Sequence, residues 1–321
     1  MKPTSLLIIL VLGAIGLSGC ASSPQPTLPP STSISTGVMP LGHWQVVRRI
    51  NYSQLATTNL KGDLGPAYRL YLVTMAGFHT DTFGLTVGPD DDVRYTTDSG
   101  QSWTKAASAL YCRHGLDIVN EKVAWHCGNG GTRVSTDGGQ TWQTVTPAAC
   151  PYLSFLDART GWAASPYILQ ATTDGGVSWN RIAPPSAAQD IVAVALRTAN
   201  EGYVLDTAGN LFVTADGGQS WVAQSLGLKA GERLIPTAEG PKAVLRFVDA
   251  QHGMVVFDLV DRTVWFALTV DGGQTWQRAE ISELRGQSYY YHLYLARDGR
   301  LLTVTDDFNN GANTSLVLRY Q

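Results

Sequence analysis

Charged residues are scarce in this sequence, and a positive net charge is missing. Asp, Glu, Lys and Arg make up 15% of the 321 residues, and the formal net charge is −3. Nucleic-acid-binding domains usually present a basic stripe, so we expect no nucleic-acid partner. An average globular chain has about 25% charged residues and about 7% Gly, whereas this one has 33 Gly. Few charges and many turn residues favour an all-β protein with many short strands.

A hydrophobic run long enough to cross a membrane is missing too. The apolar run from Leu6 to Leu17 follows Lys2 and is shorter than the roughly 20 residues that a spanning helix needs. A Leu-Ser-Gly-Cys sequence ending at Cys20 follows this run and resembles a bacterial lipobox. The resemblance implies that residues 1–19 are a lipoprotein signal peptide and that Cys20 is acylated, typically with palmitate. We therefore expect an exported protein, lipid-anchored to a bacterial cell membrane. The alternative is free export after cleavage, and Ala21 leaves the choice of membrane open.

Charge is entirely absent from residues 21–42, which contain five Pro, five Ser and three Thr. Pro-rich segments adopt extended backbone at about 3 Å per residue. We therefore interpret residues 20–42, including the lipidated Cys, as a membrane tether. The folded domain is expected over residues 43–321.

Cysteines are few, and only three follow Cys20: Cys112, Cys127 and Cys150. Export places them in an oxidising setting where thiols pair, and an odd number leaves one over. The favoured disulfide joins Cys112 to Cys127, and the alternative joins Cys112 to Cys150. Sequence alone does not determine the connectivity.

A metal site is not expected either. Cys112, His114, His126 and Cys127 are residue types that bind zinc, but their spacing matches no standard zinc pattern. One short acidic run, at residues 90–92, is too little to surround a Ca²⁺ ion, which takes six to eight oxygen ligands. No cofactor is predicted.

The sequence does contain a repeat, an eight-residue box of the form Ser/Thr-x-Asp-x-Gly-x-x-Trp. Its five copies have these Asp and Trp residues: Asp98 and Trp103, Asp137 and Trp142, Asp174 and Trp179, Asp216 and Trp221, and Asp271 and Trp276. The five Asp are 39, 37, 42 and 55 residues apart. That spacing is close to the roughly 40 to 50 residues of a propeller blade.

Each residue type in the box has a structural reason. Asp can accept hydrogen bonds from backbone N–H groups two or three residues on, and Gly supplies the positive φ of a tight turn. The Trp is large enough to pack between neighbouring sheets. Five copies of one site are typical of fold maintenance, so we expect these residues to be structural and predict no catalytic residue.

A second pattern runs in phase with the box. Residues 155–162 align without a gap to residues 247–254, and each reads as a strand, a polar turn and a second strand. A third strand enters the box and a fourth leaves it, so the unit is a four-stranded antiparallel meander. Six blades are favoured, with the strand at residues 43–47 closing the ring on the C-terminal strands. Seven blades are the alternative and would need residues 51–78 to form their own unit.

The boxes resemble the Asp-box, or BNR, repeat of sialidases, other exported glycosidases and the photosystem II assembly factor family. The Thr-Asp-Gly-Gly-Gln-Thr/Ser-Trp sequence is most similar to the assembly factor type. The resemblance implies a β-propeller that acts as a non-catalytic protein-binding or assembly scaffold. The alternative is an exported glycan-binding protein or a sialidase-like glycoside hydrolase. However, the N-terminal Arg-Ile-Pro motif of sialidases does not appear.

A blade of this kind sorts its loops onto two faces. The boxes and first hairpin turns share one face, and the loops between blades share the other, where we expect a protein partner to bind. The candidate residues of the binding face are Arg113, Glu232, Arg233, Asp261, Arg285 and Tyr290. The long insert at residues 225–241 also belongs there, and either recognition or a neutral insertion explains it.

Overall fold

The computed structural model describes residues 41–52, 75–87, 93–106, 115–128, 131–148, 151–235, 243–261, 263–285, 291–306 and 314–321. All of these belong to one unit, residues 31–321. The predicted signal peptide, Cys20 and the tether before residue 41 lie outside the described residues.

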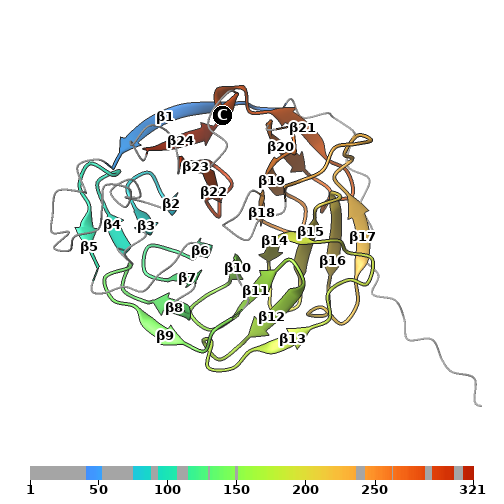
Figure 1. The fold of residues 1–321 in the computed structure, drawn as a ribbon, viewed down its shortest axis with the longest axis horizontal. Helices are drawn as coiled ribbons and strands as arrows, with labels where there is room; N and C mark the ends of the chain where they lie inside the picture. Colours follow the sequence, from blue (N-terminus) through green and yellow to red (C-terminus); the bar gives the residue numbers. More distant parts are fainter. Residues whose placement is uncertain are drawn as a thin grey trace, which may run out of the picture. The chain divides into compact units, whose positions relative to one another are not determined.

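The strands form six four-stranded antiparallel sheets arranged as the blades of a propeller (Figure 1). Blade 1 contains β2 (Met75–Phe78), β3 (Gly84–Val87), β4 (Val93–Thr96) and β5 (Thr104–Lys105). Blade 2 contains β6 (Gly115–Ile118), β7 (Ala124–Gly128), β8 (Gly131–Ser135) and β9 (Gln143–Val145). Blade 3 contains β10 (Tyr152–Phe155), β11 (Gly161–Ser165), β12 (Ile168–Thr172) and β13 (Asn180–Ile182). Blade 4 contains β14 (Ile191–Leu196), β15 (Gly202–Asp206), β16 (Asn210–Thr214) and β17 (Val222–Ser225). Blade 5 contains β18 (Ala243–Phe247), β19 (Gly253–Asp258), β20 (Val264–Thr269) and β21 (Gln277–Glu280). A short 3-10 helix, Ser282–Leu284, follows blade 5.

Blade 6 closes the ring by combining both ends of the domain. It contains β22 (Tyr291–Leu295), β23 (Leu301–Asp306), β24 (Thr314–Tyr320) and, outermost, β1 (Trp44–Asn51). The six-bladed fold and its closure by the N-terminal strand are therefore confirmed. The seven-bladed alternative is wrong, because the strands at both ends of the segment it required already belong to blades 6 and 1.

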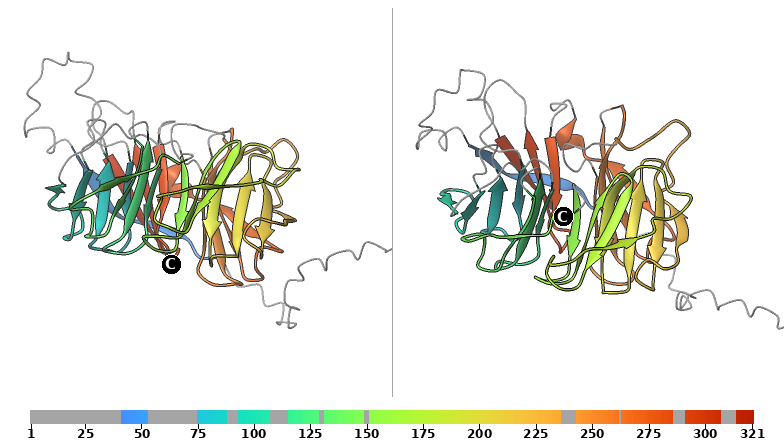
Figure 2. Two further views of the ribbon diagram at one scale, coloured as in Figure 1. Left: turned by 90° about the horizontal axis from the view of Figure 1, so that it is seen from below. Right: turned by 60° about the horizontal axis from the view of Figure 1, so that its bottom comes forward.

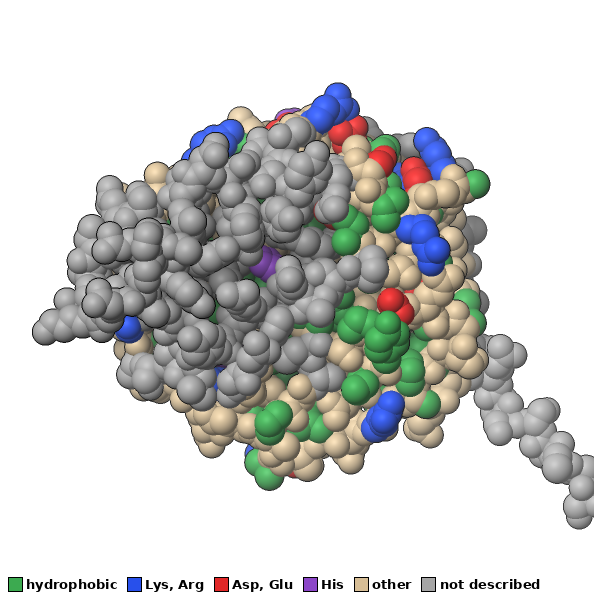
Figure 3. Space-filling model, in the orientation of Figure 1, with side chains coloured by type: hydrophobic (Ala, Val, Ile, Leu, Met, Phe, Trp, Pro, Cys, Tyr) green, Lys and Arg blue, Asp and Glu red, His purple; other side chains and the backbone are tan. Residues whose placement is uncertain are grey.

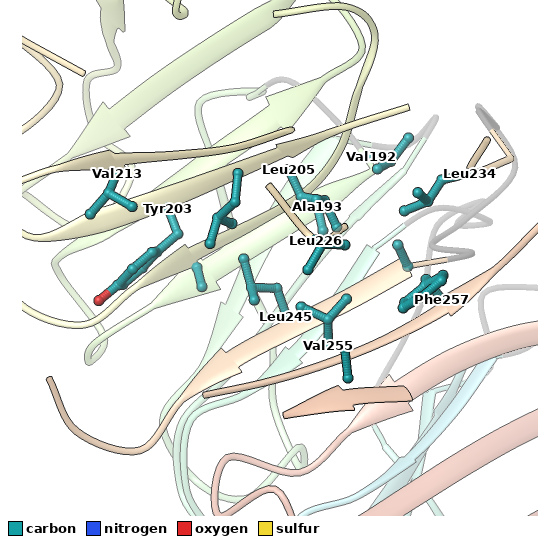
Figure 4. Packing of buried hydrophobic residues seen from close by; sticks show 14 of the residues in the cluster. Val192, Ala193, Tyr203, Leu205, Val213, Leu226, Leu234, Leu245, Val255 and Phe257 are labelled. Atoms are coloured by element: carbon teal, nitrogen blue, oxygen red, sulfur yellow. The ribbon is translucent and has the colours of Figure 1, made fainter. Parts of the chain in front are cut away.

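The core lies between blades. Six hydrophobic clusters occupy the six interfaces between neighbouring blades. Figure 4 shows the cluster between blades 4 and 5, where Leu205 of β15 faces Leu245 and Val255 of blade 5. Both faces of each sheet are thus covered, which explains why the innermost strands β2, β6, β10 and β14 are buried without alternation.

The closing strand β1 serves two interfaces through a β-bulge. Its register with β24 shifts between Val46 and Arg48. Before the bulge, Trp44 and Val46 belong to the cluster between blades 5 and 6. After it, Ile50 belongs to the cluster between blades 6 and 1, and Arg48 lies over the ring of Phe78. One extra residue in a strand reverses its alternation, so the bulge lets one strand pack on both neighbours.

The two ends of the strands form two distinct faces, which Figure 2 shows from the side. In five blades, the N–H after the box Asp donates to a carbonyl of the first hairpin turn. These bonds join Ser99 to Thr82 (3.0 Å), Gly138 to Lys122 (2.8 Å), Gly175 to Arg159 (3.0 Å), Gly217 to Asn200 (2.8 Å) and Gly272 to Gln251 (2.9 Å). We call this end the box face. The connections between blades and between second and third strands lie at the other end, the opposite face.

The box Trp residues are less buried than the sequence predicts. All five are half-buried, whereas the fully buried Trp residues are Trp44, Trp125 and Trp162. Trp125 stacks on Phe155 of the next blade at 3.9 Å between ring centroids, and the box residue Trp179 meets the edge of the same Phe at 6.1 Å. Between blades 2 and 3, the fully buried aromatic is therefore the Trp of the second strand, and the box Trp contacts the edge of Phe155.

An ion triad joins four blades at the axis of the ring. The buried Asp117 of β6 accepts hydrogen bonds from Arg246 of β18 at 3.0 Å and from Arg297, just after β22, at 2.9 Å. It also accepts the N–H of Phe155 in β10 at 2.7 Å. Blades 2 and 5 are three steps apart in a six-bladed ring, so the contact between Asp117 and Arg246 crosses the axis.

The donors of both arginines are also directed to backbone carbonyls. Arg297 donates to the carbonyls of Ile118 and Phe155, and Arg246 to the carbonyl of Leu295. Charges removed from water cost stability unless paired and hydrogen-bonded, and here they are both. The triad thus links residues of blades 2, 3, 5 and 6 across the axis of the ring.

Asp117→Asn should lower the free energy of unfolding by about 3 to 5 kcal/mol, because it leaves two guanidinium groups beside a neutral amide. Urea unfolding followed by tryptophan fluorescence measures this loss. Asp81→Asn is the matched control: Asp81 pairs with Arg319 at an exposed position, and such pairs contribute about 1 kcal/mol or less. Equal losses in the two variants would contradict the role of the triad.

Trp162→Ala should cost about 3 to 5 kcal/mol, as expected for a buried aromatic side chain. Trp142→Ala removes a half-buried side chain and should cost less than about 2 kcal/mol. Chemical denaturation of both variants, followed by far-UV circular dichroism, provides the comparison. A larger loss for Trp142→Ala would show that the box Trp carries the interface after all.

Candidate functional site

The box carboxylates are occupied by bonds within their own turns. In blade 3, Asp174 Oδ1 accepts the Thr172 hydroxyl at 2.8 Å and the Ser178 N–H at 3.0 Å, while Oδ2 accepts the Ser178 hydroxyl at 2.7 Å. The Thr172 hydroxyl in turn accepts the N–H of Gly176 at 2.9 Å. The other four boxes repeat these four bonds. The arrangement favours a structural role for the box Asp.

Sequence reasoning missed the second hydroxyl of the box. The Asp accepts from the residue four positions on, rather than mainly from those two or three positions on. The signal was available, because the position before the Trp is Ser or Thr in every copy: Ser102, Thr141, Ser178, Ser220 and Thr275. A position that alternates only between two hydroxyl residues indicates a hydrogen-bonding role.

These bonds change the acidity of the box carboxyls. Hydrogen bonds from Ser102, first through its hydroxyl and then through its N–H, lower the pKa of Asp98 to about 2. The Ser178 hydroxyl and N–H lower the pKa of Asp174 to about 2 in the same way. Donors that favour the charged form make each box a fixed carboxylate at neutral pH.

On the opposite face, the structure describes four of the six candidate binding residues. Glu232 pairs with Arg278 at 2.7 Å, and Arg285 pairs with Glu280 through two bonds of 2.9 and 2.6 Å. Asp261 accepts the Thr263 N–H at 3.0 Å and its hydroxyl at 2.6 Å. Three of the candidates therefore already have partners within blade 5 and its connections.

Arg233 differs from these three. It donates to the side-chain oxygen of Gln189, on the connection between blades 3 and 4, and no carboxylate of the described residues pairs with it. The two remaining candidates, Arg113 and Tyr290, lie outside the described residues. The face thus gathers Glu232, Asp261 and Arg285 around β21, with Arg233 on the side toward blade 4.

One residue of β21, Arg278, was not predicted. Trp265 of β20 is half-buried, and the Arg278 guanidinium lies 5.1 Å from the centre of its ring. Arg278 is thereby placed between Trp265 and Glu232. In the sequence, the only signal for the position of Arg278 is strand alternation, which puts residues 278 and 280 on the same side of β21.

The described part of the long insert, residues 225–235, is packed onto the propeller. Leu226 and Leu234 are buried in the cluster between blades 4 and 5. Leu234 also forms an isolated β-bridge with Leu259, in the turn after β19. The insert is therefore a strap across two blades, which a neutral surface insertion would not require.

Cys127 is disulfide-bonded, and its partner lies outside the described residues. Cys112 and Cys150 both lie there as well, so pairing with Cys112 stays a prediction.

His126 is buried. Its burial and, to a smaller extent, the positive charge of Arg133 lower the pKa of His126 to about 3. Among the residues that the structure describes, no group of three His, Cys, Asp or Glu side chains could hold a metal ion.

The acidic run at residues 90–92 lies outside the described part of the chain. In that described part, no helix has the length and apolar character needed to cross a membrane.

Figure 3 looks onto the opposite face. Hydrophobic side chains gather there on the side of blades 4 and 5, to the right of the centre, with single charged side chains among them.

Comparisons with known proteins agree with the repeat and the fold. The repeat described as BNR/Asp-box repeat matches residues 133–144, which include the whole box of blade 2. No curated protein matches the sequence. The chain is similar to the solved structure "YCF48 bound to D1 peptide", with a TM-score of 0.52 and 15% identity over 78% of this chain and 77% of that one.

The chain is also similar to the GH74 xyloglucanase from Xanthomonas campestris. The TM-score is 0.51 and the identity is 12%, over 83% of this chain and 52% of the xyloglucanase, so the match spans about half of that enzyme. At such low identities these likenesses show the fold alone. The chain is a six-bladed propeller with Asp-box repeats, and it shares the propeller fold with the YCF48 and xyloglucanase structures.

Acid should destabilise the protein through its boxes. Asp98 and Asp174 have a pKa of about 2 when folded and about 3.9 when unfolded. The unfolded chain therefore binds more protons between these values. The stabilisation is complete above about pH 4 and is lost as the pH falls to about 2.

Urea midpoints measured from about pH 5 to about pH 2 test this dependence. The double variant Ser102→Ala and Ser178→Ala keeps both carboxyls but removes their hydroxyl donors, so its midpoint should fall less steeply. Ser186→Ala, at an exposed position outside the boxes, is the control and should follow the unmodified chain. An identical pH dependence in all three proteins would show that the boxes do not shift these carboxyls.

Proposed function

We propose that this Asp-box propeller is an exported, lipid-anchored bacterial protein that binds a protein partner through its opposite face and has no chemistry of its own. The observation that carries the proposal is the division between the two faces. Five similar turns occupy the box face and use their polar groups on one another, whereas the connections of the opposite face differ in length, charge and aromatic content. Specific recognition needs such differences, and a rigid scaffold commonly presents them on loops.

The fold neighbours are consistent with a protein partner. The YCF48 structure is described as bound to a D1 peptide, so a propeller of this fold is known to hold a peptide. Shared fold alone does not carry function, and we infer only the class of ligand from it.

Glycan binding or cleavage is the second candidate, and the likeness to the xyloglucanase fold favours testing it. Incubation of the purified propeller with xyloglucan, followed by chromatography of released oligosaccharides, distinguishes the two. Release of oligosaccharides would establish an enzyme and contradict a non-catalytic scaffold.

Anchoring depends on Cys20, so Cys20→Ser should remove lipid labelling and leave the protein unprocessed or soluble. Metabolic labelling with palmitate, followed by detergent extraction of membranes, measures both effects. Because lipid chains contribute about 0.8 kcal/mol for each buried methylene group, loss of two or three chains should abolish stable membrane attachment. Equal labelling of the variant and the unmodified protein would contradict the lipoprotein proposal.

A further inference from the structure

A line of lateral contacts crosses the opposite face from blade 3 to blade 5. The Tyr167 hydroxyl, in the turn after β11, lies 3.5 Å from the Asp190 carboxylate on the connection between blades 3 and 4. The Asp190 carbonyl accepts the N–H of Thr207, in the turn after β15, at 3.0 Å. The Thr207 carbonyl then accepts the N–H of Leu234 in the insert at 3.0 Å.

The line continues to the turn after β19. The Val260 N–H donates to the carbonyl of Arg233 at 3.1 Å, and the Arg233 guanidinium donates back to the Gln189 side chain. We call the surface formed by Tyr167, Gln189, Asp190, Arg233 and Val260 the ledge. Segments from three blades are therefore fastened side by side.

Buried residues anchor the ledge to the core between blades 4 and 5. Leu234 is 1% exposed and Leu226 is 2% exposed, and both belong to the cluster between blades 4 and 5. The Gln189 N–H also donates to the buried carboxylate of Asp206 at 3.0 Å. The backbone of the ledge is thereby fixed before a partner binds. Binding therefore costs little backbone entropy, which favours affinity.

Arg233 has no carboxylate partner among the residues that the structure describes. Arg278 and Arg285, on the same face, are each paired with a Glu. Arg233 is exposed and bonds only an amide oxygen among the described residues, and Lys229 is exposed four residues earlier. Asp190 is half-buried beside Tyr167. The exposed positive charge near Arg233 is therefore complementary to a carboxylate of a ligand.

The ledge also exposes apolar surface at both ends. Tyr167 is 70% exposed and Val260 is 53% exposed. Tyr and Arg are enriched among the residues that dominate binding energy at protein interfaces. An elongated ledge with an aromatic end, an apolar end and a cation between them fits an extended chain segment.

We propose that the ledge binds an extended peptide segment of the partner, in which a carboxylate meets Arg233 and apolar side chains pack on Tyr167 and Val260. This inference rests on the proposed function, whose binding face it narrows to five residues. It predicts that Arg285 contributes less to the binding affinity than Arg233, because Arg285 is already paired with Glu280.

A phage-displayed library of random 12-residue peptides, selected on the full chain, tests the proposal. Selected peptides should combine Asp or Glu with aromatic or aliphatic residues. Arg233→Ala and Tyr167→Ala should each weaken binding of a selected synthetic peptide at least about tenfold, which equals about 1.4 kcal/mol. Arg285→Ala, the matched control on the same face, should change the affinity less than about twofold. Thermal unfolding of each variant confirms that it is folded.

Three outcomes would overturn the ledge. Selected peptides that bind Arg233→Ala and Arg285→Ala equally well would place the contact elsewhere. Failure to select any peptide, together with binding of oligogalacturonate that Arg233→Ala abolishes, would identify an acidic glycan as the ligand. Peptides that bind the box face would contradict the proposed function as well as the ledge proposal. Peptides that bind elsewhere on the opposite face would contradict the ledge proposal alone.

Discussion

Closure of the ring by β1 is the constraint on which the rest of the structure depends. Each blade exposes apolar side chains on both sides, so every sheet needs a neighbour on each side. Blade 6 takes its outermost strand from the start of the domain, with pairs running from Trp44 and Tyr320 to Asn51 and Thr314. Backbone bonds between His43 and Gln321, at 3.0 and 3.1 Å, fasten the two ends. Without this strand, two interfaces would lose part of their core and blade 6 would expose an unpaired edge.

Closure also fixes what each face can do. A ring held by repeated box turns and by Asp117 at the axis is rigid on the box face, and its polar groups there are bonded to one another. The opposite face carries the connections between blades, whose lengths are not set by the repeat. The insert after β17 uses that freedom, since its buried leucines fasten it across two blades while Arg233 stays exposed. A rigid box face is thus consistent with the recognition that we propose for the opposite face.

Local patterns in the sequence were sufficient for the fold. The spacing of the five box Asp predicts a blade length from residues close together in the chain. The strand at residues 43–47 predicts the closure because it reads like a strand that follows a box but has no box before it. The box Trp was overestimated as core, since the sequence does not show that the second-strand Trp already occupies the interface. The triad of Asp117, Arg246 and Arg297 could not be predicted, because its members are far apart in sequence and meet only when six blades surround one axis.

The candidate site was predicted in part. Placing Glu232, Arg233, Asp261 and Arg285 on one face follows from the meander alone. Which of them are free to bind does not, because the pairing of Glu232 with Arg278 depends on how the insert folds back. The pair of Glu280 and Arg285 is nearer in sequence, five residues apart, but only the turn at Ser282–Leu284 brings the two side chains together.

Site-specific photocrosslinking tests the central claim, that the partner binds the opposite face. A photoreactive phenylalanine analogue is placed either at position 167 or at position 177 of the full chain, in native membranes. Tyr167 and Val177 both belong to blade 3 and are 70% and 72% exposed, but they lie on the opposite face and the box face respectively. The account predicts a crosslinked protein from position 167 and none from position 177. A crosslink from position 177 alone would contradict it.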